Sequence, residues 1–303
     1  MRKALGGLAA AALLATGCGA GQTADRPQPE QARLAATPTV TVVAAGDIAC
    51  PPGARVTRRT CRQAATARAA QALSPDRVLV LGDLQYPSGR YRAFRRSYAK
   101  SWGKLRSITW PVPGNHEYET RGARGYYRYF ANRQPGSPGW YRRALNGWQM
   151  YFLNSNCGKV DCAAQRAWLE SEMAANPSTC SLVVTHHPRF SSGDHGNTAR
   201  MRKFWEIAYR HHADVVLSGH DHDYERFAPM SPTGAVEATR GIQQFVSGGG
   251  GKNLYPRETT VPGSERFVKA FGVLELTLTP TAYSWSYRGI RLGVRDSGSA
   301  ACR

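Results

Sequence analysis

Five short apolar segments of the chain each end in polar side chains of the kinds that bind metal ions. With the residues that follow, they read TVVAAGD, RVLVLGD, TWPVPGNHE, SLVVTHHP and DVVLSGHDH. Short apolar runs bounded by turn residues are typical of buried strands. Because α/β sheets bind ligands in the crevice at the carboxyl ends of their strands, we expect these polar side chains to gather at one site.

The apolar segments alternate with stretches of helical composition and spacing, which predicts an α/β layered fold. Helices are expected at residues 60–73, 89–102, 163–175 and 199–212. Strands are expected at residues 39–45, 77–81, 107–112, 147–155, 181–185, 214–218, 241–248, 271–278 and 282–288. The last strands have no helices between them, which indicates mixed sheets.

In chain order, the polar residues form the blocks GD, GDxxY, GNHE, VxxH and GHxH. This series, which covers about residues 40–227, resembles the five-block signature of the metallophosphoesterases. The GDLQY block makes the chain look specifically like a purple acid phosphatase of the small, single-domain bacterial type. The resemblance implies a four-layer α/β/β/α sandwich with mixed sheets.

The resemblance also implies a role for seven residues as ligands of two metal ions. Metal one would be held by Asp47, Tyr86 and His222, and Asp83 would bridge to metal two. The remaining ligands of metal two would be these three: Asn115, His186 and His220. Carboxylates and a phenol suit Fe(III) in site one, whereas imidazoles and an amide suit a divalent Zn, Mn or Fe ion in site two.

The activity implied by this centre is hydrolysis of a phosphate monoester through attack of a metal-bound hydroxide, which makes the chain a phosphoric ester hydrolase. His116 of the GNHE block would contact the phosphate, and His195 in SSGDHGNT would stabilise phosphate charge or protonate the leaving group. Most members of the wider superfamily have a histidine where this chain has Ala49. Tyr86 is therefore expected to replace that ligand.

The N-terminus resembles an export signal. Residues 1–18 combine Arg2 and Lys3 with an apolar stretch too short to span a membrane, and LLATGC resembles a lipoprotein box ending at Cys18. Ordinary signal cleavage nearby is the alternative. Residues 19–38 are expected to form a flexible tether, and residues 39–303 a metallophosphoesterase domain. The chain is thus expected to be secreted or to be a cell-envelope lipoprotein.

The cysteines agree with an exported chain. If Cys18 accepts a lipid, six cysteines remain, an even number that suits disulfides in an oxidising compartment. Short spacing favours two of the pairs, Cys50 with Cys61 and Cys157 with Cys162. Cys180 and Cys302 are then left, and their disulfide would fasten the C-terminus to the core.

The net charge of +19, from 40 basic and 21 acidic residues, suits anionic partners. The expected partner is a phosphorylated small molecule or polymer, with nucleic acid only as a substrate and a membrane only through a lipid on Cys18. We expect a monomer. Two alternatives remain open: a phosphodiesterase or nuclease with the same metal centre, and a non-catalytic phosphate-binding protein of the envelope.

Overall fold

The computed structural model describes residues 37–291 and 293–303. The predicted signal segment at residues 1–18, including Cys18, lies outside the described residues, as does most of the predicted tether. Within the described ranges, none of the helices combines the length and the apolar character that crossing a membrane requires.

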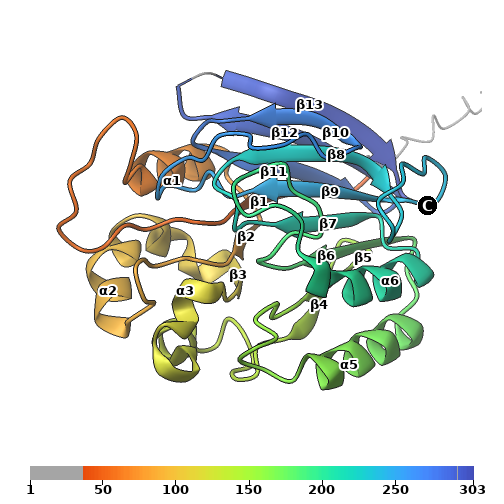
Figure 1. Cartoon of the computed structure of the whole chain (residues 1–303), viewed down its shortest axis with the longest axis horizontal. Coiled ribbons are helices and arrows are strands. Elements are labelled where there is room, and N and C mark those ends of the chain that lie inside the picture. Colours follow the sequence, from red (N-terminus) through yellow and green to blue (C-terminus); the bar gives the residue numbers. More distant parts are fainter. Residues whose placement is uncertain (1–36, 292) are drawn as a thin grey trace, which may run out of the picture. The chain divides into compact units, whose positions relative to one another are not determined.

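Two β-sheets form the centre of the fold (Figure 1). The strand order of the six-stranded sheet is β13 (Gly293–Ala301), β12 (Ala282–Gly289), β11 (Gly272–Thr279), β1 (Val40–Ala45), β2 (Arg77–Leu81) and β3 (Thr109–Val112). The order of the seven-stranded sheet is β10 (Ser264–Val268), β8 (Tyr224–Met230), β9 (Ile242–Ser247), β7 (Val215–Ser218), β6 (Cys180–Val184), β5 (Trp148–Phe152) and β4 (Tyr141–Leu145). Strands β1–β3 are parallel, as are β5, β6, β7 and β9, and the other pairings are antiparallel, so both sheets are mixed.

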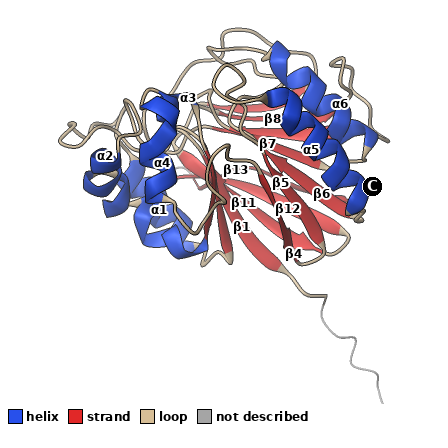
Figure 2. Ribbon diagram, turned by 90° about the horizontal axis from the view of Figure 1, so that it is seen from below, coloured by secondary structure: helices blue, strands red, loops and turns tan. Residues whose placement is uncertain are grey.

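Helices cover the outer face of each sheet, as Figure 2 shows. The first sheet carries α1 (Gln63–Ala72), α2 (Tyr91–Arg96), α3 (Asn115–Tyr118) and α4 (Arg124–Tyr129), with 3₁₀ turns at Tyr98–Lys100, Trp102–Ile108 and Arg121–Ala123. The second carries α5 (Cys162–Ala175) and α6 (Arg202–Arg210), the latter preceded by a 3₁₀ turn at Ala199–Met201. The predicted four-layer α/β/β/α fold is confirmed.

Alternation of side chains along the strands divides the apolar residues among three cores. Val42 and Ala44 of β1 point between the sheets, where they join a core with Leu182 and Leu217 of the second sheet. Val43, the intervening residue, points outward to the core beneath α1 and α2. Alternate residues of β6 and β7 likewise form a third core with α5 and α6. Because both faces of the parallel strands are largely buried, most of the residues of these strands are apolar.

The structure corrects the predicted helix at residues 89–102, which breaks into α2 and two 3₁₀ turns. The breaks fall at Ser97 and Ser101, whose backbone angles are not helical. The hydroxyl of Ser97 donates to the Cys50 carbonyl at 2.7 Å, and that of Ser101 donates to the Tyr98 carbonyl at 3.2 Å. Serine side chains compete in this way with helical hydrogen bonds.

The strand predictions missed β4, β8, β10 and β13. Strand β8 contains Glu225 and Arg226, and β13 is rich in small and polar residues, so neither has an apolar run that identifies a strand. Pairing with long neighbouring strands stabilises them instead, since β13 pairs along most of β12.

All three expected disulfides are present. Cys50–Cys61, Cys157–Cys162 and Cys180–Cys302 have Cα–Cα distances of 5.3, 5.2 and 5.3 Å. The third joins the start of β6 to the residue after β13, as the count of cysteines predicted.

Candidate metal centre

The five polar blocks meet at the carboxyl ends of the parallel strands. Asp47, Asp83, His186 and His220 are each the second residue after their strand, and Asn115 begins the helix that follows β3. Backbone hydrogen bonds hold the sheets together here: the Gly46 N–H donates to the Ser247 carbonyl at 2.8 Å. The His220 N–H donates to Asp47 Oδ2 at 2.9 Å. This hydrogen bond joins the loop after β7, in the seven-stranded sheet, to the loop after β1, in the six-stranded sheet.

Tyr86 forms the centre of the first donor group. Its hydroxyl oxygen lies 3.0 Å from Asp47 Oδ1 and 2.9 Å from His222 Nε2. The same oxygen lies 3.2 Å from Asp83 Oδ2. Two carboxylates, a phenol and an imidazole therefore face one point, and all four residues are buried.

His186 forms the centre of the second donor group. Its Nε2 lies 3.0 Å from Asn115 Oδ1 and 3.2 Å from His220 Nδ1. Asp83 Oδ2, the oxygen that approaches Tyr86, is also 3.4 Å from His186 Nε2. The carboxylate of Asp83 thus lies between the two groups, where a bridging ligand would have to be.

The hydrogen bonding of His186 indicates that the site is built for a cation. Its Nδ1 is 2.8 Å from the Leu81 carbonyl oxygen, which can only accept, so Nδ1 carries a proton. The lone pair of neutral Nε2 then points at the oxygens of Asn115 and Asp83. Such converging lone pairs repel one another unless a proton or a metal ion lies among them, and this donor set suits a dinuclear metal centre.

The pKa shifts at the site agree with this reasoning. Burial lowers the pKa of His186, but the nearby Asp83 and Asp47 carboxylates outweigh it and raise the pKa to about 9. Burial, together with the same two carboxylates, raises the pKa of Tyr86 well above its ordinary value. The phenol of Tyr86 would therefore ionise only beside added positive charge, such as that of a metal ion.

Three of these residues have unusual backbone angles. Asp47, Asp83 and His220 have φ of 59°, 50° and 72°, in the left-handed region that non-glycine residues rarely adopt. Such strain persists where the surrounding structure imposes it, and it is common at functional sites. Gly114 is required for a different reason, which is space: a Cβ at this position would collide with Asp83 Oδ1.

His116 and His195 lie at the exposed side of the donor groups. Their side chains are 34% and 37% exposed, whereas those of His186 and His222 are 0% and 4% exposed. His116 Nδ1 lies 2.6 Å from the Pro87 carbonyl oxygen, and its Nε2 lies 3.9 Å from Asp83 Oδ2. The ring of His195 lies 4.1 Å from that of His220, so both histidines could reach a ligand of the metal centre.

Asp221 orients His195 and alters its acidity. Asp221 Oδ1 accepts from the backbone N–H of His195 at 2.8 Å and lies 3.0 Å from its Nδ1. The side-chain hydrogen bond to Asp221 raises the pKa of His195 although partial burial lowers it. His195 therefore stays protonated to a higher pH than an ordinary histidine.

Glu117 holds the loops that carry the donors, a role the sequence did not reveal. Its buried Oε2 accepts the N–H groups of Asp83 at 2.9 Å and Gly114 at 2.8 Å. Its Oε1 accepts those of Leu84 at 3.0 Å and Gln85 at 3.2 Å. Burial, followed by the charge of Asp83, raises the pKa of Glu117 to about 8, whereas the N–H donors favour its carboxylate form.

The glycine-rich segment at residues 247–253 lies against the first donor group. Asn253 Oδ1 is 3.1 Å from His222 Nδ1, which leaves His222 Nε2 facing Asp47 and Tyr86. Tyr255 stacks on His222, with ring centroids 4.1 Å apart. Neither contact follows from the local sequence, because the donors and this segment come from separate strands.

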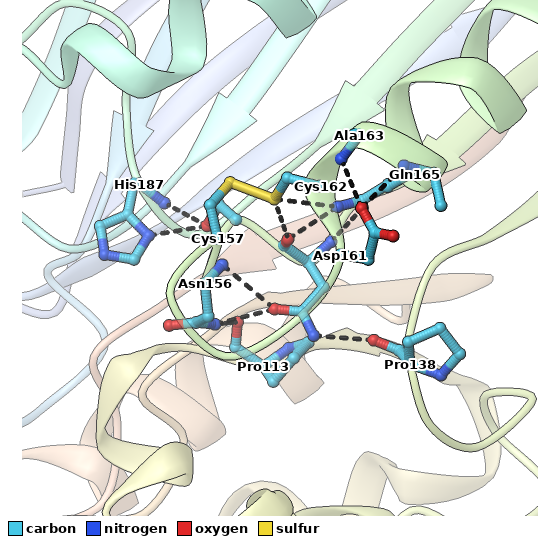
Figure 3. The surroundings of a disulfide bond; sticks show 12 residues. Pro113, Pro138, Asn156, Cys157, Asp161, Cys162, Ala163, Gln165 and His187 are labelled. Carbon is cyan, nitrogen blue, oxygen red and sulfur yellow. Dashed lines mark hydrogen bonds between the residues drawn. A yellow bond between two sulfur atoms is a disulfide. The ribbon is translucent and has the colours of Figure 1, made fainter.

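His187 lies beside the second donor group. Its Nδ1 is 2.7 Å from Ser155 Oγ, and its ring centroid is 4.4 Å from that of His220. Figure 3 shows the Cys157–Cys162 disulfide, which closes a short loop directly after Asn156. Asn156 donates to the Pro113 carbonyl at 3.3 Å, so residues 155–156 link the segments before Asn115 and after His186.

Comparisons with known proteins show which proteins the chain resembles. Residues 40–224 match the family described as calcineurin-like phosphoesterase. A phosphoenolpyruvate phosphatase of Allium cepa is 30% identical over 175 residues, which cover 49% of this chain but only 36% of that protein. A tartrate-resistant acid phosphatase type 5 of Sus scrofa is 25% identical over 292 residues, which cover 81% of this chain and 82% of that one.

Among solved structures, a purple acid phosphatase from yellow lupin (Lupinus luteus) seeds has the same fold. The TM-score is 0.67 at 17% identity, and the match covers 88% of this chain and 54% of the lupin chain. At this level of identity the likeness concerns the fold alone.

Proposed function

The chain belongs to the calcineurin-like phosphoesterase family, and from this premise we propose that it hydrolyses phosphate monoesters at a dinuclear metal centre. The observation that carries the proposal is the position of Asp83. Its Oδ2 lies 3.2 Å from the Tyr86 hydroxyl and 3.4 Å from His186 Nε2, between two groups of donors. A carboxylate in this position is suited to bridge two ions.

We assign Asp47, Tyr86 and His222 to the first ion. Asn115, His186 and His220 are assigned to the second ion, and Asp83 is shared. The anionic oxygens of the first group favour a trivalent ion, Fe(III), and the imidazoles of the second favour divalent Zn, Mn or Fe. When bound, two such ions would polarise the phosphoryl oxygens and lower the pKa of a coordinated water.

The exposed histidines would act on the substrate. His116 has its Nδ1 occupied by the Pro87 carbonyl, which leaves Nε2 directed towards the phosphate position near Asp83. His195, kept protonated by Asp221, would donate a proton to the leaving oxygen or stabilise the charge of the phosphate. Partial exposure of both rings suits residues that must meet a ligand from solvent.

A phosphodiesterase activity is the second candidate. The net charge of +19 supports it, because a negatively charged polymer with phosphodiester bonds would be attracted to the surface. The two activities differ in the number of ester groups on the phosphorus. Turnover of nitrophenyl phosphate and bis-nitrophenyl phosphate by the same preparation separates them. A monoester rate well above the diester rate supports the proposal, and the reverse ratio supports the second candidate.

A non-catalytic phosphate-binding role is the remaining alternative. The presence of all seven donors argues against it, since a protein that only binds phosphate has no need of a bridging carboxylate. Metal analysis together with the nitrophenyl phosphate assay tests the proposal. Two metal ions per chain and metal-dependent turnover are expected, whereas two bound ions without turnover of either ester would support the binding role.

We further propose that residues 39–303 form one exported metallophosphoesterase domain that acts as a monomer, either secreted or held at the envelope by a lipid on Cys18. Three disulfides support export, because such bonds persist in oxidising compartments. Mass analysis of the mature N-terminus tests the anchor. A lipid-modified Cys18 is expected, and an unmodified terminus further along the chain would contradict it.

A further inference from the structure

Four arginines surround a hollow that the proposed mechanism does not use. The hollow has a volume of about 540 Å³ and is lined by Arg90, Arg121, Arg124 and Arg128, with Glu119 as the acidic residue of the lining. The arginine–carboxylate ion pairs among the described residues use other arginines: Arg142, Arg202, Arg210, Arg226 and Arg288. The lining of this hollow, here called the arginine pocket, thus has four arginines and one glutamate, an excess of positive charge.

Close packing of the backbone brings these arginines together. Helix α4 lies directly against the loop before α2, because a Cβ on Gly125 would collide with the Gly89 carbonyl and lie 2.6 Å from the Tyr91 nitrogen. The Arg128 guanidinium lies 4.1 Å from the centre of the Tyr91 ring. Ala123, between Arg121 and Arg124, has a left-handed φ of 49°, a conformation that is unfavourable for alanine.

The arginine pocket and the metal centre are built on the same two segments. Arg90 follows Tyr86 by four residues, so their Cα atoms are at most about 14 Å apart. Arg121 follows His116 by five residues. The Thr120 hydroxyl donates to the Ser88 carbonyl, which ties the two segments together beside the hollow. Figure 2 shows α2, α3 and α4 grouped at one side of the sheets.

The chemistry of the pocket suits a ligand with several negative charges. Guanidinium groups bind phosphate, sulfate and carboxylate through paired hydrogen bonds. Four arginines that line one hollow repel each other, and a single small anion would leave some of them unpaired. We propose that the arginine pocket binds an oligoanion, either as the second phosphate of a substrate or as a separate molecule. The substrate form of this proposal rests on the proposed function.

Binding is tested on the holoprotein with pyrene tetrasulfonate, a fluorescent oligoanion whose sulfonates are weak metal ligands. Fluorescence anisotropy at an ionic strength of about 0.15 M, where the screening length is about 8 Å, should detect binding to the wild type. Arg121→Glu/Arg124→Glu should weaken it by about tenfold or more for each arginine, since each loses a charged hydrogen bond. The matched control is Arg92→Glu/Arg95→Glu, which has the same change in charge on exposed α2 positions outside the hollow. It should retain the wild-type affinity within about twofold, as expected for charges beyond the contact.

Three results would contradict the proposal that the arginine pocket binds an oligoanion. They are no binding to the wild type, equal weakening in both double variants, or displacement of the probe by orthophosphate at the concentration that inhibits turnover. The last result would mean that the probe binds at the metal centre. Circular dichroism and turnover of nitrophenyl phosphate confirm that both variants fold. Because probe binding needs no turnover, an inactive protein that binds the probe contradicts the proposed function and leaves the pocket intact.

Kinetics distinguish the two sources of the anion. If the pocket holds a second phosphate of the substrate, Arg121→Glu/Arg124→Glu should raise KM for hexanediol bisphosphate and leave KM for nitrophenyl phosphate unchanged. If the ligand is a separate oligoanion, both KM values stay unchanged while probe binding is lost. Either result supports the pocket, and the first also identifies a class of substrate.

Discussion

Replacing Glu117 with glutamine tests whether one buried carboxylate organises the metal centre. The carboxylate accepts four backbone N–H groups, two on each oxygen, from Asp83, Leu84, Gln85 and Gly114. In Glu117→Gln, one oxygen becomes an NH₂ group, which cannot accept. Two buried N–H groups then face a donor, whichever way the amide is turned.

The expected loss follows from this count. A buried donor left without a partner destabilises the fold by about 1–3 kcal/mol, so the two together give about 2–6 kcal/mol. The free energy of unfolding should be measured by urea denaturation at about pH 9, above the Glu117 pKa of about 8, so that the carboxylate is ionised. The protein should be depleted of metal, because bound metal would add stability by mass action. Metal affinity should also fall, since Asp83 and Asn115 lie on the loops that lose these hydrogen bonds.

Glu119→Gln is the matched control, because Glu119 is exposed on the same segment and the chemical change is identical. It should change the stability by no more than about 0.5 kcal/mol. If Glu117→Gln lowers the free energy of unfolding by less than about 1 kcal/mol, the four N–H contacts do not depend on an ionised carboxylate, and our account of these loops is wrong.

Three further predictions concern the proton donor, the C-terminal disulfide and the phenol. Asp221→Asn should move the alkaline limb of the kcat/KM profile to lower pH, because Asp221 raises the pKa of His195 and the protonated ring is the active form; an unmoved limb would contradict this. Cys180→Ser/Cys302→Ser opens a loop with a sequence separation of 122 residues, and urea denaturation should find a loss of about 2–5 kcal/mol, against no loss if β13 alone secures the terminus. Tyr86→Phe should abolish visible absorption of the iron-loaded protein, and colour that persists would exclude Tyr86 as the ligand of Fe(III).

Much of the site could be predicted from sequence because strand ends impose a simple geometry. Asp47, Asp83, His186 and His220 each follow an apolar run by a fixed interval, and parallel strands bring such positions to one edge. The disulfides could also be predicted from the sequence. Cys50–Cys61 and Cys157–Cys162 are close in sequence, and the remaining pair follows by elimination.

The residues that support the site could not be predicted in this way. Glu117 was visible in the GNHE block, but its four hydrogen bonds reach backbone groups of a neighbouring loop that no periodicity identifies. Asn253 and Tyr255 contact His222 only because the segment after β9 folds across the strand ends. Strand β13 has no apolar run of its own and depends on its pairing with β12.

The proposed function requires that two metal ions occupy neighbouring positions separated by the carboxylate of Asp83. Anomalous diffraction from crystals of the metal-loaded protein tests it most directly. We expect two peaks, with Asp83 contacting both. One should be bounded by Asp47, Tyr86 and His222, and the other by Asn115, His186 and His220. A single peak, or two peaks of which one lies away from Asp83, would contradict it.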